Sequence, residues 1–183
     1  MSLRTIPSTL SLAILGLVSQ EPLTGYDLRK IFTTTPMGHF STSPGAIYPA
    51  LRRMEQAGLI RGSIERRDTL RPRQIYTITE RGRKALEERL ALPITRDDVV
   101  WRMDELMLRF AFVGDVLGKR KSLQYLEELA LRINEYIPVL VRHLESQRKS
   151  TRLTSAYALE HGIAHYKATV NWARRVIRDL EGH

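Results

Sequence analysis

Cysteine is absent from the 183-residue sequence. Its absence excludes disulfides, thiolate metal ligands and cysteine nucleophiles, and it fits a reducing compartment. The sequence also contains no glycine-rich phosphate-binding loop and no Gly-x-Ser-x-Gly nucleophile motif. We therefore expect no enzyme and no cofactor.

Long apolar runs are missing as well. The most apolar early segment, Leu10–Val18, is too short to span a bilayer and indicates a buried helix. No basic run followed by a long apolar stretch and a small-residue cleavage site opens the chain. About 43% of the residues are apolar, which is enough for a sizeable core. We expect a cytoplasmic globular protein without a membrane partner.

Acidic residues are too few to balance the basic ones. The chain has 29 Lys and Arg against 20 Asp and Glu, so its net charge is +9. Residues 1–92 carry 14 basic and 8 acidic side chains, and residues 93–183 carry 15 and 12. Arginine is the main basic residue of the first half, and guanidinium groups pair well with phosphate. The charge is compatible with nucleic acid, and also with a merely solvated surface.

Two helices are predicted at the start of the chain. Apolar residues spaced i, i+3, i+4, i+7 indicate a helix with one buried face over residues 7–19. A turn follows, and Thr24 with Asp27 forms a capping box that opens a second helix. We expect this second helix to stop before the β-branched run of residues 33–35, which Pro36 closes.

A third helix is predicted after Ser43, which would cap it, with Pro44 in its first turn. Gly58 is suited to end it. Pro49 falls inside this segment and should cost a hydrogen bond. Either the helix kinks at Pro49, or its regular part begins near Tyr48.

Residues 59–79 change to strand periodicity. Residues 59–64 and 74–79 predict two short strands, and the polar, basic segment 65–73 between them predicts the tip of a β-hairpin. Thr79 should cap a further helix that Pro93 ends. Three helices, a hairpin and a following helix are the order of a winged helix-turn-helix, which we assign to residues 1–93.

Residues 94–183 are predicted to be all helical. Thr95 with Asp98 forms another capping box, opening a segment that Gly114 and Gly118 punctuate. Two long segments follow with apolar residues at alternating three- and four-residue steps, typical of coiled-coil-like packing. Pro138 should kink the first of them. The fold class predicted for the whole chain is mainly α with a small β-hairpin: a DNA-binding domain followed by long dimerisation helices.

The third helix and the hairpin carry the functional prediction. The helix buries one stripe and presents small, aromatic and arginine side chains on the other, which suits the major groove of double-stranded DNA. The arginine-rich hairpin, stiffened by Pro72, suits phosphates or the minor groove. The candidate DNA-binding residues are Ser43, Gly45, Tyr48, Arg52, Arg53, Arg67, Arg71 and Arg73. A solvated amphipathic helix beside a charged edge hairpin is the bland alternative.

The segment Ser43–Ile60, SPGAIYPALRRMEQAGLI, resembles the recognition helix of the PadR family of bacterial transcription regulators. Three further stretches are similar to that family: residues 15–17 with 23–28, residues 71–73 with 76–79 and Gly82, and residues 161–166. The family motif also has a proline at the position of Pro49. This sequence differs from the family at Leu70, where the hairpin, or wing, commonly has a glycine. The resemblance implies a homodimer that binds an inverted-repeat operator, in most cases as a repressor released by a small apolar or aromatic effector.

The homodimer is expected to form through the C-terminal helices. The candidate dimerisation residues are Leu126, Ile133, Ile137, Leu140, Leu159, Ile163, Tyr166 and Val170. The stripe of Trp101, Met103, Met107 and Phe110 is suited to a planar apolar effector, although such a stripe is more often plain core.

Other function classes have weaker support. His161 and His165 are spaced i, i+4 and could share a metal, but no third ligand is evident, so we expect no metal site. A winged-helix adaptor or RNA-binding module remains an alternative to an operator-binding regulator. RNA recognition favours stacking aromatics on an exposed sheet, and Tyr76 is isolated.

Overall fold

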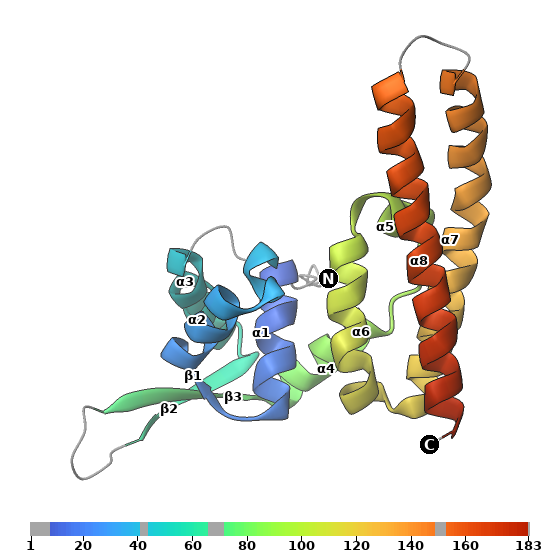
Figure 1. The fold of residues 1–183 in the computed structure, drawn as a ribbon. Coiled ribbons are helices and arrows are strands. Elements are labelled where there is room, and N and C mark those ends of the chain that lie inside the picture. Colours follow the sequence, from blue (N-terminus) through green and yellow to red (C-terminus); the bar gives the residue numbers. More distant parts are fainter. Residues whose placement is uncertain (1–7, 41–43, 66–71, 149–152, 183) are drawn as a thin grey trace, which may run out of the picture. The chain divides into compact units, whose positions relative to one another are not determined.

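The computed structural model describes residues 8–40, 44–65, 72–148 and 153–182. The chain divides into two compact units, Met1–Leu92 and Pro93–His183 (Figure 1). The elements of the first unit are α1 (Thr9–Gln20), β1 (Leu23–Thr24), α2 (Gly25–Thr34), η1 (Pro36–Phe40), η2 (Pro44–Ala46), α3 (Ile47–Gln56), β2 (Ile60–Glu65), β3 (Arg73–Ile78) and α4 (Glu80–Leu90). Those of the second unit are α5 (Arg96–Trp101), α6 (Met103–Leu117), α7 (Lys119–Arg148) and α8 (Leu153–Gly182). The predicted fold class, mostly helical with a small antiparallel sheet, is confirmed.

Helix α1 is the centre of the first unit. Ser8 caps it, because the Ser8 hydroxyl accepts a hydrogen bond from the Ser11 amide at 3.2 Å. All of residues 12–18 are buried, which confirms the buried helix expected over Leu10–Val18, although the burial is not confined to the one face that the spacing indicated. The reason is tertiary: α1 packs against α3, α4 and β3, and these elements cover it on more than one side.

Helix α2 starts at the predicted capping box. The Thr24 amide donates to the Asp27 carboxylate and the Asp27 amide donates to the Thr24 hydroxyl, both at 3.1 Å. The helix runs on through Thr34, past the point where we expected it to stop. The hydroxyls of Thr34 and Thr35 donate to backbone oxygens one turn back, at 2.8 and 2.7 Å, so both side chains fold back onto the helix.

Helix α3 begins at Ile47, after a short 3-10 turn, and the residue at its cap, Ala46, makes no side-chain capping bond. The cap predicted at Ser43 lies outside the described residues. Pro49 is the third residue of α3, where the backbone N–H has no partner within the helix. The predicted hydrogen-bond cost at Pro49 is therefore avoided, and the second of our alternatives is confirmed. Gly58 ends the segment with a φ of 70°.

The sheet has three antiparallel strands in the order β1-β3-β2. The predicted hairpin is present, and its register runs from Ile60 opposite Ile78 to Glu65 opposite Arg73. Strand β1 was predicted as part of a turn; pairing with β3 makes these two residues a strand. Thr79 caps α4 as predicted, because its hydroxyl accepts a hydrogen bond from the Gly82 amide at 3.0 Å. The same hydroxyl donates to the Gly58 carbonyl at 2.6 Å.

The second unit opens with the predicted capping box of Thr95 and Asp98. The helix that we expected to follow is two helices, because the backbone leaves helical geometry at Arg102, with φ −136° and ψ 33°. Helix α6 continues through Gly114 and ends at Gly118, whose φ is 84°. Pro138 lies inside α7, which continues to Arg148.

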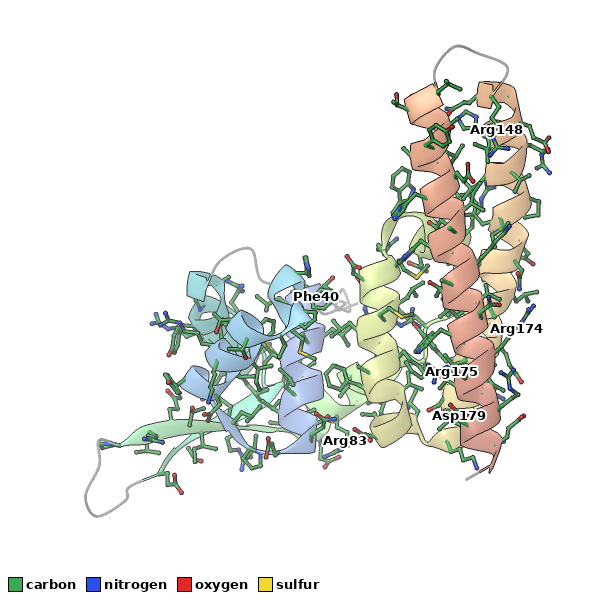
Figure 2. The ribbon with its side chains drawn as sticks, viewed as in Figure 1. Phe40, Arg83, Arg148, Arg174, Arg175 and Asp179 are labelled. Carbon is green, nitrogen blue, oxygen red and sulfur yellow. The ribbon has the colours of Figure 1, made fainter. Side chains whose placement is uncertain are left out.

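Helices α7 and α8 lie side by side as a long hairpin (Figure 1). One core cluster between them contains Leu144, Ala156 and Ile163. An ion pair of 2.8 Å between Arg148 of α7 and Glu160 of α8 lies near the end of this hairpin; Figure 2 labels Arg148 there. None of the helices in the described part of the chain combines the length and the apolar composition that crossing a membrane requires.

Candidate nucleic-acid interface

Helix α3 has the two faces that the sequence predicts. Ile47, Ala50, Leu51 and Met54 are buried against the rest of the unit. Tyr48, Pro49, Arg52 and Arg53 are exposed on the other side. The buried stripe fixes the rotation of the helix about its axis, and that rotation leaves an aromatic ring and two guanidinium groups facing outward.

An open hollow of about 560 Å³ lies between the start of α2, helix α3 and strand β3. It brings together three of the predicted DNA-binding residues: Tyr48 and Arg52 from α3 and Arg73 from the hairpin. Its full lining is Thr24, Gly25, Tyr26, Asp27, Tyr48, Arg52, Glu55, Arg73, Gln74 and Tyr76. Helix and hairpin thus form one continuous surface in the first unit.

Tyr48 packs against the first turn of α2. A Cβ added to Gly25 would lie 2.7 Å from Cε1 of the Tyr48 ring, so this close approach requires a glycine. Tyr48 remains 44% exposed, and the neighbouring Tyr26 is 68% exposed. The sequence reasoning missed Tyr26; its position in the first turn of a capped helix, close to Gly25, was the available signal.

The charges around the hollow are mixed. The hydrogen bond from Thr24 outweighs partial burial and, with Arg73 nearby, lowers the pKa of Asp27, so this carboxylate is ionised at neutral pH. Burial, followed by the charge of Glu55, raises the pKa of Tyr76, which keeps its hydroxyl neutral. Cationic Arg52 and Arg73 therefore share the hollow with the acidic residues Asp27 and Glu55, and the surface is polar as well as basic.

Two further predicted DNA-binding residues, Gly45 and Arg53, are described by the structure but do not line the hollow. Gly45 is exposed in the 3-10 turn before α3, and Arg53 is exposed on α3 itself. Ser43, Arg67 and Arg71 lie outside the described residues. At the hairpin base that is described, Arg73 is exposed on β3.

The predicted dimerisation residues lie in the second unit, and half of them are fully covered by their own chain. Leu126, Ile133, Ile163 and Val170 are buried. The other four are half-buried: Ile137, Leu140, Leu159 and Tyr166. Ile137, Leu140 and Leu159 pack on the core cluster between α7 and α8, and the Tyr166 hydroxyl donates to the Val99 carbonyl at 3.1 Å.

The four predicted effector residues do not share one environment. Trp101 is 79% exposed at the end of α5, whereas Met103, Met107 and Phe110 are half-buried on α6. Phe110 meets two further rings that the sequence reasoning missed: Tyr125 at 6.1 Å and Trp172 at 5.4 Å between ring centroids. Buried Arg109 lies over the face of Tyr125 at 5.3 Å, and burial strongly raises the pKa of the Tyr125 hydroxyl.

The two histidines considered as metal ligands, His161 and His165, are both exposed on α8. Within the described ranges, no group of three histidine or carboxylate side chains is arranged to hold a metal ion.

Comparison with known proteins finds relatives of the first unit. Residues 14–88 match the model of the "Transcriptional regulator PadR-like family". The chain is 28% identical over 123 residues to the curated "Negative transcriptional regulator PadR" of Bacillus subtilis, and the match covers 67% of this chain and 66% of that relative.

Solved structures of Bacillus subtilis PadR are similar over almost the whole chain. The complex with operator DNA is 23% identical, covering 93% of this chain and 98% of that chain, with a TM-score of 0.43. The complex with p-coumaric acid is 22% identical, covering 94% and 96%, with a TM-score of 0.39. Because these scores are below 0.5, the assignment rests on the family model and the curated relative. Residues 14–88 thus match a PadR-like domain, and over this segment the chain is similar to transcriptional regulators of that family.

Proposed function

We propose that the protein is a homodimeric repressor that binds an inverted-repeat operator in double-stranded DNA through α3 and the β2–β3 hairpin of each copy. The observation that carries the proposal is the convergence of Tyr48, Arg52 and Arg73 on one exposed surface. Two elements that are separate in sequence supply these groups, which is the arrangement that a groove-reading helix with a backbone-contacting wing requires.

The residues divide by role. Tyr48 and Arg52 face outward from α3, so they reach base edges when the helix enters the major groove, and Arg52 is suited to guanine. Gly45 allows the sugar-phosphate backbone to approach the start of the helix, and Ser43 and Arg53 contact phosphates. Arg73, with Arg67 and Arg71 of the hairpin tip, neutralises phosphates or enters the minor groove.

Repression and two-fold symmetry are part of the proposal. The curated relative is named a negative regulator, and a PadR structure was solved with operator DNA. One groove-reading helix per chain reads a half-site, and two copies joined through α7 and α8 read two half-sites of opposite orientation. Ile133 and Ile163, two of the predicted dimerisation residues, then hold α7 and α8 together. The paired helices contact the same helices of the second copy.

Release by a small apolar or aromatic effector completes the proposed function. A PadR structure was solved with p-coumaric acid, a planar aromatic carboxylic acid. Half-buried Met103, Met107 and Phe110 are suited to such a ring, because methionine adapts its shape and aromatic rings stack. Trp101, exposed at the end of α5, is the outer member of this proposed site.

The proposal is tested by selecting duplex DNA from random sequence with the purified full chain. We expect a two-fold symmetric motif with half-sites about 10 bp apart, or a multiple of that spacing. Failure to enrich any motif, or enrichment of one asymmetric site, contradicts operator binding by a dimer.

Arg52→Ala then tests how the motif is read. We expect it to weaken binding to the selected duplex by about 1–3 kcal/mol and to relax the preference at one base pair of each half-site. Arg83→Ala is the matched control, because it removes the same charge from an exposed position on α4 (Figure 2). It should leave the preference intact. An unchanged preference in Arg52→Ala would assign Arg52 to a phosphate instead of a base.

A further inference from the structure

Strand β2 is at the edge of the sheet, since the strand order is β1-β3-β2. Backbone amides on the outer side of an edge strand have no neighbouring strand to bond. The Gly62 amide nevertheless has a partner: it donates to Oε1 of Glu55 at 2.9 Å. Glu55 belongs to α3, so this bond joins the recognition helix to the base of the hairpin.

Gly62 is suited to this contact because it has no side chain. A Cβ at this position would lie 2.6 Å from Oε1 of Glu55 and would also overlap the side-chain amide of Gln74. In the register of the hairpin Gly62 is opposite Tyr76, whose ring is buried beneath the hollow. The glycine therefore leaves room for a carboxylate to reach the backbone of β2.

The bond lies close to the groups that face DNA in the proposed function. Glu55 is one helical turn after Arg52 and lines the same hollow as Arg73. In the strand register Arg73 is opposite Glu65. Glu65 is three residues after Gly62 on β2, so the two positions are about 10 Å apart at the usual rise of a strand. A change of angle at Gly62 would therefore displace Arg73 relative to Arg52.

We propose that Glu55 is a positioning residue: its hydrogen bond to Gly62 holds the hairpin against α3 so that Arg52 and Arg73 engage DNA together. The inference rests on the proposed function, because it concerns how the same surface is assembled. Fixing the hairpin before binding removes part of the ordering cost that binding would otherwise carry.

Two substitutions separate the hydrogen bond from the charge. Glu55→Gln and Glu55→Ala both remove the carboxylate charge, but only glutamine keeps an oxygen that can accept from the Gly62 amide. We expect Glu55→Gln to bind the selected duplex at least as tightly as the wild type, because a negative charge has been removed near phosphate. Glu55→Ala should bind about tenfold more weakly than Glu55→Gln, the effect of one lost hydrogen bond.

Combination with Arg73→Ala distinguishes positioning from a general loss of structure. In the wild type and in Glu55→Gln, Arg73→Ala should cause its full loss of affinity. In Glu55→Ala the additional loss should be much smaller, because the hairpin is no longer held where Arg73 reaches DNA. Gly62→Ala should reproduce the behaviour of Glu55→Ala from the other side of the bond, and it serves if Glu55→Ala does not fold. Hydrogen exchange of the Gly62 amide should be slow in the wild type and Glu55→Gln and fast in Glu55→Ala.

The outcomes separate the two proposals. If the wild type binds its selected duplex but Glu55→Ala binds as tightly as Glu55→Gln, the positioning role is wrong and the proposed function stands. Equal losses from Arg73→Ala in all three backgrounds also overturn the positioning role. If the wild type enriches no duplex at all, it is the proposed function that fails, and hydrogen exchange at Gly62 still reports whether the bond exists in the free protein.

Discussion

At Gly82, helix α4 lies against the backbone segment that follows α3. The two are so close that no side chain fits between them. A Cβ at this position would overlap the carbonyl oxygen of Leu59 and crowd the side chain of Ile78. The same carbonyl accepts a hydrogen bond from the Thr79 amide at 3.1 Å. The glycine thus allows α4 to pack at the point where the hairpin closes, which supports the surface carrying Arg73.

Gly82→Ala should lower the free energy of unfolding by about 2–3 kcal/mol, because the contact is with backbone and neither chain can move aside easily. Gly162→Ala is the matched control. Gly162 lies inside α8 with no atom near its Cβ position, so alanine there should raise the free energy of unfolding by about 0.5–1 kcal/mol. Urea unfolding at one fixed protein concentration measures both. Equal stability of the two variants would mean that α4 is not held at Gly82.

At the scale of elements, carboxylates fix where two helices begin. Burial alone would raise the pKa of Asp98, but hydrogen bonds from Thr95 and the nearby Arg102 and Arg109 lower it below its ordinary value of 3.8. The ionised form is therefore the one that stabilises the start of α5. This contribution is complete above pH 3.8 and is lost as pH falls through the lower pKa of the folded protein.

Asp98→Ala should accordingly cost about 1 kcal/mol of stability at pH 7, the usual effect of a lost cap. The difference between Asp98→Ala and the wild type should shrink when unfolding is measured at progressively lower pH below 3.8. Asp97→Ala, one residue earlier and exposed, is the control. It should lower the stability less than Asp98→Ala at pH 7. A difference that persists unchanged at low pH would show that ionisation of Asp98 does not matter.

The hairpin is the second element with a measurable role. Each neutralised phosphate contributes about 0.9 to the slope of log affinity against log salt concentration. Arg73→Ala should therefore weaken binding to selected and random duplexes by similar factors, and flatten the slope by about one unit for each site engaged. If Arg73 enters the minor groove instead, the loss should be larger on A·T-rich flanks. An unaltered slope with unaltered affinity would mean that the hairpin does not touch DNA.

At the scale of the whole molecule, the two units have different surfaces. The first carries most of the excess positive charge, and the second leaves large apolar side chains uncovered on its helices, including Leu131 and Tyr157 at 54% and 65% exposed. Ile133, two residues from Leu131 on α7, is fully buried. Ile133 therefore tests contacts within the chain, whereas Leu131 tests the contacts that we expect with a second copy.

We expect the wild type to sediment as a dimer at micromolar concentration. Leu131→Glu should weaken the expected dimer and leave helix content unchanged, because the new charge lies on a surface that its own chain leaves exposed. Ile133→Glu should instead unfold the second unit, since an unpaired charge in a core costs several kcal/mol. Sedimentation velocity and circular dichroism measure the two effects. A monomeric wild type would contradict the dimer, and a dimer insensitive to Leu131→Glu would place the interface elsewhere.

The sequence by itself determined the features that depend on a few neighbouring residues. The capping boxes at Thr24 and Thr95 were predicted correctly, because a side chain and an amide three residues apart meet whatever the rest of the chain does. The end of the third helix at Gly58 and the presence of a hairpin after it are local in the same way. The outward stripe of Tyr48 and Arg52 followed from the helical repeat.

Only the tertiary structure decided which surfaces meet. Strand β1 exists because β3 lies beside it, and α1 is buried on more than one side because α3, α4, β3 and η1 pack on it. The spacing of apolar residues predicted neither the break at Arg102 nor the burial of four predicted dimerisation residues within their own chain. This spacing identifies the apolar face of a helix but not the element that covers it. The contact of Glu55 with Gly62 joins a helix to an edge strand, and neither residue signals its partner in the sequence. The covalent chain brings residues three or four positions apart together, and this sets the helix caps. The pairing of β1 with β3, the packing around α1 and the bond of Glu55 to Gly62 join separate elements, so they depend on how the helices and strands pack.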